Sequence, residues 1–271
     1  MVHGEKPISH AIDAHTPSVA RMYDWLLGGV ENYASDRDAC AQLLEIAPSS
    51  KALALNNRAF LRRVVRILAK DYGVRQFLDH GSGLPTQDNV HQVAQHIDPG
   101  CRVVYIDNDP IVLAHGRTTL EENGNTAVIS ADMRETEEIF GHPEVQRLIH
   151  LDEPVAALFV SVLHCLPGEQ EPAQLVGRVA DKLPKGSFMV MCQLVSDNPA
   201  VRQGVTDLMA QSTGGNWGRV REQREVEAFF TGMQILPPGL TDVVDWRPDT
   251  PPPPPDQRPE DWMEWGGVAQ L

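Results

Sequence analysis

The sequence predicts an α/β protein in which a mostly parallel sheet carries helices on both faces. Five apolar runs each end in polar residues or glycine, as buried parallel strands do. Amphipathic segments separate the runs, which is the pattern of right-handed βαβ crossovers. The length of 271 residues suits one large core better than two. The runs are 75–81, 102–109, 126–133, 155–164 and 187–195.

The chain is expected to begin with a flexible segment and a short helix. Residues 1–15 are polar and show no periodicity, so we expect them to be poorly ordered. Thr16 and Pro17 are typical of a helix cap and a first helical position. Apolar residues at helical spacing follow, until Gly28 and Gly29 end the pattern.

Two further helices are predicted before the first strand. Ser35 followed by Asp38 resembles the capped start of a helix that runs to about Ile46. A longer periodic segment runs from about Ser50 to Tyr72. The first 73 residues are therefore expected to be helical wherever they are ordered.

The last two strands are expected to pair with each other. Segments 234–243 and 265–271 have the composition of strands, and no helical segment lies between them. Such neighbours form an antiparallel hairpin, here at the edge of the sheet. The connection contains five consecutive prolines, Pro251 to Pro255. A stiff surface loop accounts for these prolines as well as a polyproline ligand for a partner does.

Composition and charge argue against several kinds of partner. The chain has 23 Lys and Arg against 37 Asp and Glu, a formal net charge of −14, which repels phosphate backbones and anionic membranes. We therefore expect no nucleic-acid and no membrane partner. The four cysteines show no C-x-x-C spacing, and there is no apolar leader or membrane span, so we expect a soluble cytoplasmic protein. The ten histidines show no metal-ligand spacing, and we expect no metal.

The loop after the first strand contains two of the three glycines of a dinucleotide fingerprint. Gly81 and Gly83 let a ligand approach the backbone, but Pro85 and Thr86 follow where a third glycine is expected. Asp107 comes 24 residues after Gly83, the separation expected of an acid that accepts both hydroxyls of a ribose. A ligand with adenosine but no pyrophosphate fits this pattern, and S-adenosylmethionine is such a ligand. A tight glycine turn, with Asp107 as a turn residue, is the alternative.

Several strings of the sequence resemble one known family. They are "PSVARMYDWLLGGVENYASDR", "NNRAFLRR", "QFLDHGSGLPTQDNVHQVAQ", "RVVYIDNDPIVLAHGR", "SADMR" and "VSVLHCLP". The family consists of S-adenosylmethionine-dependent methyltransferases, found mainly in actinomycetes and long described as a domain of unknown function. The resemblance extends from about residue 16 to the end. His80 departs from it, because an apolar residue is expected inside this loop, and the proline stretch is longer than expected.

The resemblance implies a Rossmann-like, seven-stranded methyltransferase fold with a helical N-terminal cap. We accordingly divide the chain into a flexible segment 1–15, a cap 16–73 over the cofactor site and a core 74–271. The resemblance also implies S-adenosyl-L-methionine as cofactor. It does not imply what is methylated, and we expect the methyl acceptor to be an unidentified small molecule. The residues expected to bind the cofactor are Tyr23, Arg58, Asp79, Gly81, Ser82, Gly83, Thr86, Asp107, Asn108, Asp132, Met133 and Ser161.

These residues suggest a division of the cofactor among the strand ends. We expect the backbone from Gly81 to Gly83 to meet the methionine portion and Asp107 to meet the ribose. Asp132 and the Met133 amide are expected to meet the adenine edge. All of these positions follow strands whose carboxyl ends share one edge of the sheet.

Methyl transfer from a sulfonium needs orientation more than acid–base chemistry, because the donor is already activated. His164 is either a base for an acceptor that loses a proton or a structural histidine bonded to a loop carbonyl. Tyr23 either closes over the cofactor and takes part in catalysis or packs as a core aromatic. Arg58 either pairs with the methionine carboxylate or forms a surface ion pair.

Two other functions share these sequence features. One is a sensor that binds S-adenosylmethionine without turnover, since methyl transfer has no obligatory catalytic residue. The other is an NAD(P)-dependent oxidoreductase, which has the same fold and the same acid after the second strand. Pro85 and Thr86 argue against the oxidoreductase, because they crowd the helix N-terminus on which a pyrophosphate would lie.

Overall fold

The structure is a computed structural model that describes residues 13–121, 123–166, 168, 171–254, 257–259 and 261–271. At its centre is an eight-stranded sheet in the order β3-β2-β1-β4-β5-β8-β6, with β7 also paired to β8. Strands β1 to β5 are parallel, and β8 is antiparallel to its neighbours β5, β6 and β7. The predicted mostly parallel sheet with an antiparallel C-terminal edge is confirmed. The strands are β1 (Gln76–His80), β2 (Arg102–Asp107), β3 (Thr126–Ser130), β4 (Ala156–Val160), β5 (Phe188–Val195), β6 (Gln234–Ile235), β7 (Thr241–Asp242) and β8 (Met263–Gln270).

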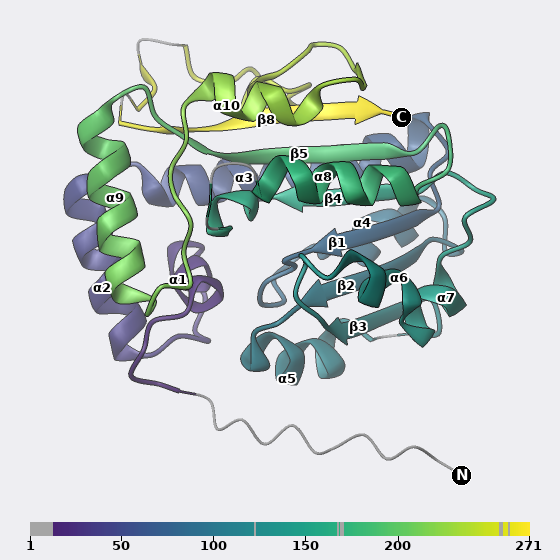
Figure 1. Ribbon diagram of the computed structural model, residues 1–271, viewed down its shortest axis with the longest axis horizontal. Coiled ribbons are helices and arrows are strands. Elements are labelled where there is room, and N and C mark those ends of the chain that lie inside the picture. The colour runs from purple at the N-terminus through teal and green to yellow at the C-terminus, as the bar shows by residue number, and fades with distance from the viewer. Residues whose placement is uncertain (1–12, 122, 167, 169–170, 255–256, 260) are drawn as a thin grey trace.

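Helices cover both faces of the sheet (Figure 1). One apolar core lies between the sheet and α3, α4 and α5, and a second lies between the sheet and α6, α7, α8 and α10. Three helices begin with a proline, which has no N–H to leave without a partner at the first helical position. The helices are α1 (Val19–Leu26), α2 (Ala34–Ile46), α3 (Ser50–Asp71), α4 (Val90–Ile97), α5 (Pro110–Thr119), α6 (Thr136–Gly141), α7 (Pro143–Leu148), α8 (Glu171–Lys182), α9 (Pro199–Ser212) and α10 (Gln223–Glu227), with 3-10 turns η1 (Leu163–Cys165) and η2 (Ala228–Phe230).

The C-terminal strands differ in detail from the predicted hairpin. Segment 234–243 forms two short strands, β6 and β7, and both pair with β8. Pro237 and Pro238 separate them, because proline cannot donate to a strand ladder, and Gly239 turns the chain with a φ of 106°. The strand predicted at 265–271 begins two residues earlier, at Met263. Two strands in place of one explain why the sheet has eight strands where seven were expected.

His80 also lies elsewhere than expected. It is the last residue of β1 and not part of the loop that follows. Its ring is fully buried and stacks on Phe159, with 4.3 Å between the ring centroids. Burial lowers the pKa of His80 to about 4, so the ring is uncharged at neutral pH. An uncharged, stacked imidazole fills the position where we expected an apolar residue.

A third apolar core belongs to a cap at the carboxyl ends of the parallel strands. Helices α1, α2 and α9 lie together on the side toward which these strands point (Figure 1). Their apolar side chains share one cluster with the start of α3 and with Trp262. The later turns of α3, from Phe60 onward, pack instead against the sheet. The division at residue 73 stays a prediction, and the packing adds α9 to the cap.

The first two helices begin at other residues than expected. Helix α1 begins at Val19, two residues after Pro17, and Ser18 precedes it. The acid at the start of α2 is Asp36 and not Asp38. Asp36 is fully buried and accepts hydrogen bonds from the backbone N–H groups of Ser18 (2.9 Å) and Tyr33 (2.8 Å).

Arg21 completes the cluster around Asp36. Its Nε lies 2.8 Å from Asp36 Oδ2, and the Arg21 and Asp36 side chains are only 4% and 0% exposed. The Asp36 carboxylate therefore joins the starts of α1 and α2 through one buried ion pair and two backbone hydrogen bonds.

The two predicted polar segments are only partly described. Most of 1–15 lies outside the described residues, but the Ala14 carbonyl accepts a hydrogen bond from Ser35 Oγ at 2.8 Å. In the proline-rich connection, Pro255 lies outside the described residues. Arg258 joins this connection to the fold, because it donates to the Pro253 carbonyl (2.8 Å) and pairs with Asp245 (2.6 Å). A role as a ligand for a partner stays a prediction.

We expect Asp36→Ala to lower the free energy of unfolding by about 3–5 kcal/mol, the usual cost of removing one partner of a buried ion pair. The variant leaves the Arg21 charge buried and takes an acceptor from the N–H groups of Ser18 and Tyr33. Asp38→Ala is the matched control, because Asp38 is exposed on the same turn, and it should change stability by less than about 0.5 kcal/mol. Urea denaturation measures both, and equal stability of the two variants would contradict the role of Asp36.

Candidate functional site

A cavity of about 690 Å³ lies at the carboxyl ends of the parallel strands, between the sheet and the cap. Open parallel sheets bind their ligands at this edge. The volume falls within the range of small-molecule sites, about 300–1,000 Å³. The loops after β1 to β4 line the cavity from the sheet, and residues of α1, α3, α9 and β8 complete the wall.

The glycine loop after β1 forms part of this wall. Gly81 and Gly83 have φ angles of 68° and 67°, a region that side chains other than glycine rarely adopt. A Cβ on Gly81 would lie 2.3 Å from Val162 Cγ2, so glycine is needed there for close packing as well. A Cβ on Gly83 would meet nothing within 4 Å. Gly83 therefore leaves open space beside the backbone, whereas Gly81 lets the loops after β1 and β4 approach each other.

Asp107, at the end of β2, holds the glycine loop in place. Its Oδ2 accepts a hydrogen bond from the Gly83 N–H and its Oδ1 one from the Asp109 N–H, both at 2.9 Å. Burial raises the pKa of Asp107 to about 6, although these backbone hydrogen bonds oppose the change. The carboxylate lines the cavity while it also fixes two loops, so the turn and ligand interpretations are compatible.

Asp79, on β1, is a buried acid that interacts with the charges of Asp107 and Arg58. Burial raises the pKa of Asp79 to about 7; the Arg58 charge opposes this and the Asp107 charge adds to it. Arg58 lines the cavity from α3, and its Nη2 donates to the carbonyls of Gln87 (3.2 Å) and Asp88 (3.1 Å). No ion pair of Arg58 is found among the described residues, and its role toward the cofactor stays a prediction.

The ends of β2 and β3 contribute Asn108, Asp132 and Met133 to the wall. The Asp132 carboxylate accepts from Arg134 Nε at 3.0 Å, which lowers the pKa of Asp132. Thr86 is not among the residues that line the cavity. Its N–H donates to Asn89 Oδ1 at 3.0 Å, at the start of α4. The structure thus brings together every residue predicted for the site except Thr86.

The Tyr23 hydroxyl connects two helices of the cap. It accepts from Asn57 Nδ2 (3.0 Å) and is within 3.3 Å of the Ala54 carbonyl, to which it donates. Burial raises the pKa of Tyr23, although part of its ring lines the cavity. The phenol is therefore held as an uncharged group between α1 and α3.

His164 lies in η1 and lines the cavity beside Trp217. The two ring centroids are 4.7 Å apart, and His164 is only 3% exposed. Burial, together with the charge of Arg221, lowers the pKa of His164 to about 3. The imidazole is therefore uncharged at neutral pH and is a poor proton acceptor.

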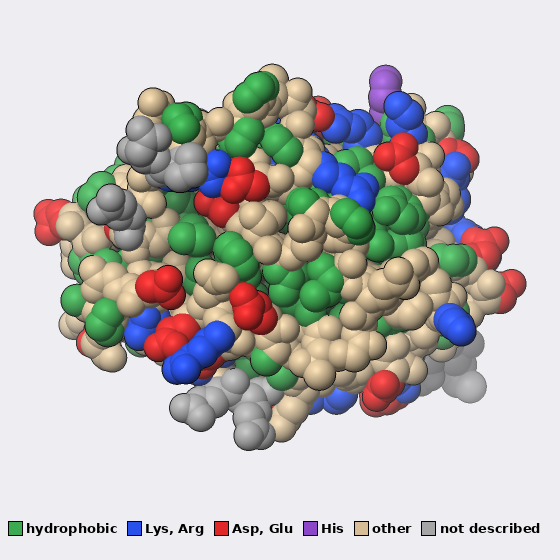
Figure 2. Space-filling view, turned by 90° about the horizontal axis from the view of Figure 1, so that it is seen from above, with side chains coloured by type: hydrophobic (Ala, Val, Ile, Leu, Met, Phe, Trp, Pro, Cys, Tyr) green, Lys and Arg blue, Asp and Glu red, His purple; other side chains and the backbone are tan. Residues whose placement is uncertain are grey.

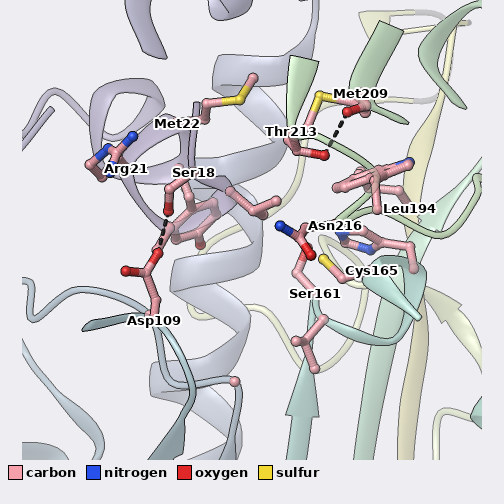
Figure 3. A pocket seen from close by; sticks show the side chains of 18 of the residues that line it. Ser18, Arg21, Met22, Asp109, Ser161, Cys165, Leu194, Met209, Thr213 and Asn216 are labelled. Atoms are coloured by element: carbon pink, nitrogen blue, oxygen red, sulfur yellow. Dashed lines mark hydrogen bonds between the residues drawn. The ribbon is translucent and has the colours of Figure 1, made fainter. Parts of the chain in front are cut away.

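Two polar contacts of the site were not foreseen. Ser18 Oγ donates to Asp109, which connects the start of α1 to the start of α5 across the cavity (Figure 3). Ser161 Oγ donates to Glu264 on β8, and Glu264 is 3% exposed. The sequence does contain a signal for the second contact, because Glu264 is an acid within an apolar strand. The strand predicted at 265–271 starts after Glu264, so the prediction does not include this acid.

The remaining wall, below the cap, is mainly apolar. The side chains of Leu194, Met22 and Met209 line this part of the cavity, and Thr213 and Asn216 lie among them (Figure 3). Trp217 and Trp262 complete this part of the lining. Within the described part of the chain, no group of three or more His, Cys, Asp or Glu side chains is arranged to hold a metal.

The comparisons with known proteins agree with this architecture. A family model described as "S-adenosyl methyltransferase" matches residues 5–271. A solved structure from Thermobifida fusca YX, provisionally described as a methyltransferase, is 38% identical, covers 98% of this chain and 99% of its own, and has a TM-score of 0.90. A DUF574 family protein from Streptomyces avermitilis is 34% identical, covers 96% and 99%, and has a TM-score of 0.85. No curated protein matches the chain. Because the family model spans almost the whole chain, and the resemblance of the sequence is thereby confirmed, the chain belongs to the S-adenosyl methyltransferase family, whose cofactor is S-adenosylmethionine.

Proposed function

We propose that the protein transfers a methyl group from S-adenosylmethionine to a small-molecule acceptor within the 690 Å³ cavity. One observation carries this proposal. Residues from four successive strand ends, predicted separately as cofactor ligands, line a single cavity that continues beneath the cap. The cavity thus has a polar part for the cofactor and an apolar part for a second molecule.

The adenosine portion fits the ends of β2 and β3. All three residues proposed for it line the cavity: Asp107 for the ribose hydroxyls, and Asp132 and Met133 for the adenine edge. Thr86 lies outside the cavity and its N–H is bonded to Asn89. A third glycine is unnecessary at this position, because the ligand has no pyrophosphate to lie on the start of α4.

The methionine portion fits the glycine loop. Its ammonium group and the sulfonium are cationic, and Asp79 supplies a buried carboxyl beside them. Ser82 lines the same loop, and its Oγ is buried with no hydrogen-bond partner in the described structure. Arg58 uses one of its nitrogens for two carbonyls, and a guanidinium has further N–H donors for the methionine carboxylate.

The chain's contribution to methyl transfer is chiefly orientation and exclusion of water. The cap closes the cavity through Ser18 and Asp109 and through the Tyr23 hydroxyl between α1 and α3. With a pKa of about 3, His164 is an uncharged imidazole at neutral pH, so it can orient an acceptor by hydrogen bonding but is a poor base. We therefore propose positioning roles for Tyr23 and His164.

We also propose that the acceptor is not a nucleic acid and that the protein is cytoplasmic, from its charge and its cysteines. Figure 2 shows one face of the molecule, on which basic side chains lie interspersed with acidic ones and do not form a continuous basic patch. No helix in the described ranges is long and apolar enough to span a membrane. The mixed charges on this face and the net charge of −14 support an acceptor other than nucleic acid. The cysteines are unpaired, which supports a reducing, cytoplasmic location.

We expect S-adenosylmethionine and S-adenosylhomocysteine to raise the melting temperature of the protein. A ligand at about 100 times its dissociation constant stabilises the folded state by roughly 2.7 kcal/mol. NAD and NADP should produce no shift, because Pro85 and Thr86 leave no site for a pyrophosphate. Thermal shift measurements with all four ligands test this, and stabilisation by NAD alone would contradict the proposal.

Cofactor affinity should also fall as the pH is lowered through about 7. The pKa of Asp79 in the free protein is raised to about 7, so the acid is protonated below this pH and charged above it. A cationic ligand prefers the carboxylate, so each pH unit below the pKa should cost up to about tenfold in affinity.

Asp79→Asn separates this effect from that of Asp107, which titrates near pH 6. The variant should bind S-adenosylhomocysteine more weakly at pH 7.5 and should lose the change of affinity between pH 6.5 and 7.5. Asp38→Asn, on the exposed start of α2, is the control and should keep the wild-type profile. Calorimetric titrations that give parallel profiles for wild type and Asp79→Asn would contradict the role of Asp79.

A further inference from the structure

The strand order divides the cavity into two parts. Strands β1, β2 and β3 carry the acids that the proposed function assigns to the cofactor. Strands β4, β5 and β8 lie on the other side of β1, and α9 lies at the end of the sheet toward which β4 and β5 point (Figure 1). On the proposed function, this second part of the cavity holds the methyl acceptor.

The second part offers no cation to a bound molecule, so far as the chain is described. Arg21 reaches the wall from α1, but its guanidinium is paired with Asp36. His164 is uncharged at neutral pH. An anionic acceptor would lose its hydration there without gaining a partner, which is costly. The apolar lining includes Met22, Leu53, Leu194, Met209, Trp217 and Trp262.

Ser161 is a polar group of this part, beside the end of β4 (Figure 3). It has a φ of 56°, a left-handed conformation that is uncommon for a residue other than glycine, and its N–H donates to the Cys192 carbonyl at 2.9 Å. Because Ser161 Oγ donates its proton to Glu264 Oε1, its lone pairs remain to accept a hydrogen bond from a ligand. Glu264 Oε2 is buried, with no hydrogen-bond partner in the described structure.

Among the described residues, the titratable groups that interact with Glu264 are all acids. They are Cys192 on β5, Asp242 on β7, Tyr23 on α1 and Cys165 in η1. Burial raises the pKa of Glu264 to about 8; hydrogen bonds from Ser161 and Cys192 oppose this, and the Asp242 charge adds to it. Glu264 is therefore mostly protonated at pH 7 and becomes a proton acceptor as the pH rises through about 8.

We propose that the methyl acceptor is an uncharged, largely apolar molecule whose O–H or N–H donates to Ser161, and that Ser161 relays the proton to Glu264. A lone pair of the acceptor atom forms the bond to the methyl carbon as the carbon–sulfur bond breaks, and that electron pair stays on sulfur. The acceptor proton passes to Ser161 Oγ while the Ser161 hydroxyl proton passes to the ionised Glu264. Glu264 returns the proton to solvent after the product leaves.

Three probes of similar shape test the charge requirement: 2-naphthol, 2-naphthoate and 2-naphthylmethylammonium. Each is titrated calorimetrically into the full chain saturated with S-adenosylhomocysteine. Saturation is itself a test of the proposed function, so failure of the cofactor to bind is distinct from failure of the probes. We expect 2-naphthol to bind at least about tenfold more tightly than either ion. Equal or tighter binding of an ion, or no binding of 2-naphthol to the complex, overturns the proposal.

The relay is tested by the pH dependence of 2-naphthol binding between pH 6.5 and 8.5. Wild-type affinity should rise about fivefold, because an ionised Glu264 makes Ser161 a better acceptor. Glu264→Gln still accepts from the Ser161 hydroxyl but cannot ionise, so its profile should be flat. Ser161→Ala should weaken binding about tenfold at pH 8.5. Glu45→Gln, exposed on α2, is the matched control and should behave as wild type.

Saturation with S-adenosylhomocysteine also reports that each variant is folded. If Glu264→Gln does not fold, Ser161→Ala tests the relay by itself. A profile that still rises in Glu264→Gln, or wild-type affinity in Ser161→Ala, overturns the relay.

Discussion

The site depends on the two hydrogen bonds that the Asp107 carboxylate accepts. One comes from the Gly83 N–H in the glycine loop, and the other from the Asp109 N–H at the start of α5. Asp109, held in this way, both caps α5 and receives the Ser18 hydroxyl from the cap. One half-buried acid therefore sets the spacing of two loops and, through its neighbour, the position of α1. Loss of either donor would leave this partly desolvated carboxylate with fewer partners, which destabilises a folded protein.

The parallel core was predictable because its signals are local. Apolar runs that end in polar residues predicted the five parallel strands. The carboxyl ends of parallel strands in one sheet share an edge. Gly81 and Gly83 could be assigned to the site because their backbone conformation is available almost only to glycine. The polar residues at four strand ends then followed without knowledge of any contact between them.

Other parts of the site depend on partners that are distant in the sequence. Asp36 and Asp38 are equivalent by local pattern, and only the burial of Arg21 against Asp36 distinguishes them. Helix α9 belongs to the cap because its apolar face meets α2, a contact that periodicity does not identify. In the sequence, Glu264 is an isolated acid in an apolar strand. Its partner Ser161 becomes evident only from the fold, in which β8 pairs with β5. Thr86 was assigned by its spacing alone, and its N–H bonds to Asn89 outside the cavity.

Because the cap combines segments from both ends of the chain, it cannot be completed until synthesis of the chain is nearly finished. Met22 and Leu43, near the N-terminus, share their apolar cluster with Val205 on α9 and with Trp262 beside β8. Ribosomes make proteins from the N-terminus, so α1 and α2 emerge long before the surfaces that cover them. Until α9 and β8 have been made, these helices present uncovered apolar side chains, which is when a growing chain is most open to aggregation or chaperone binding. A messenger truncated before the last strand would therefore yield a chain whose first helices have no complete surface on which to pack.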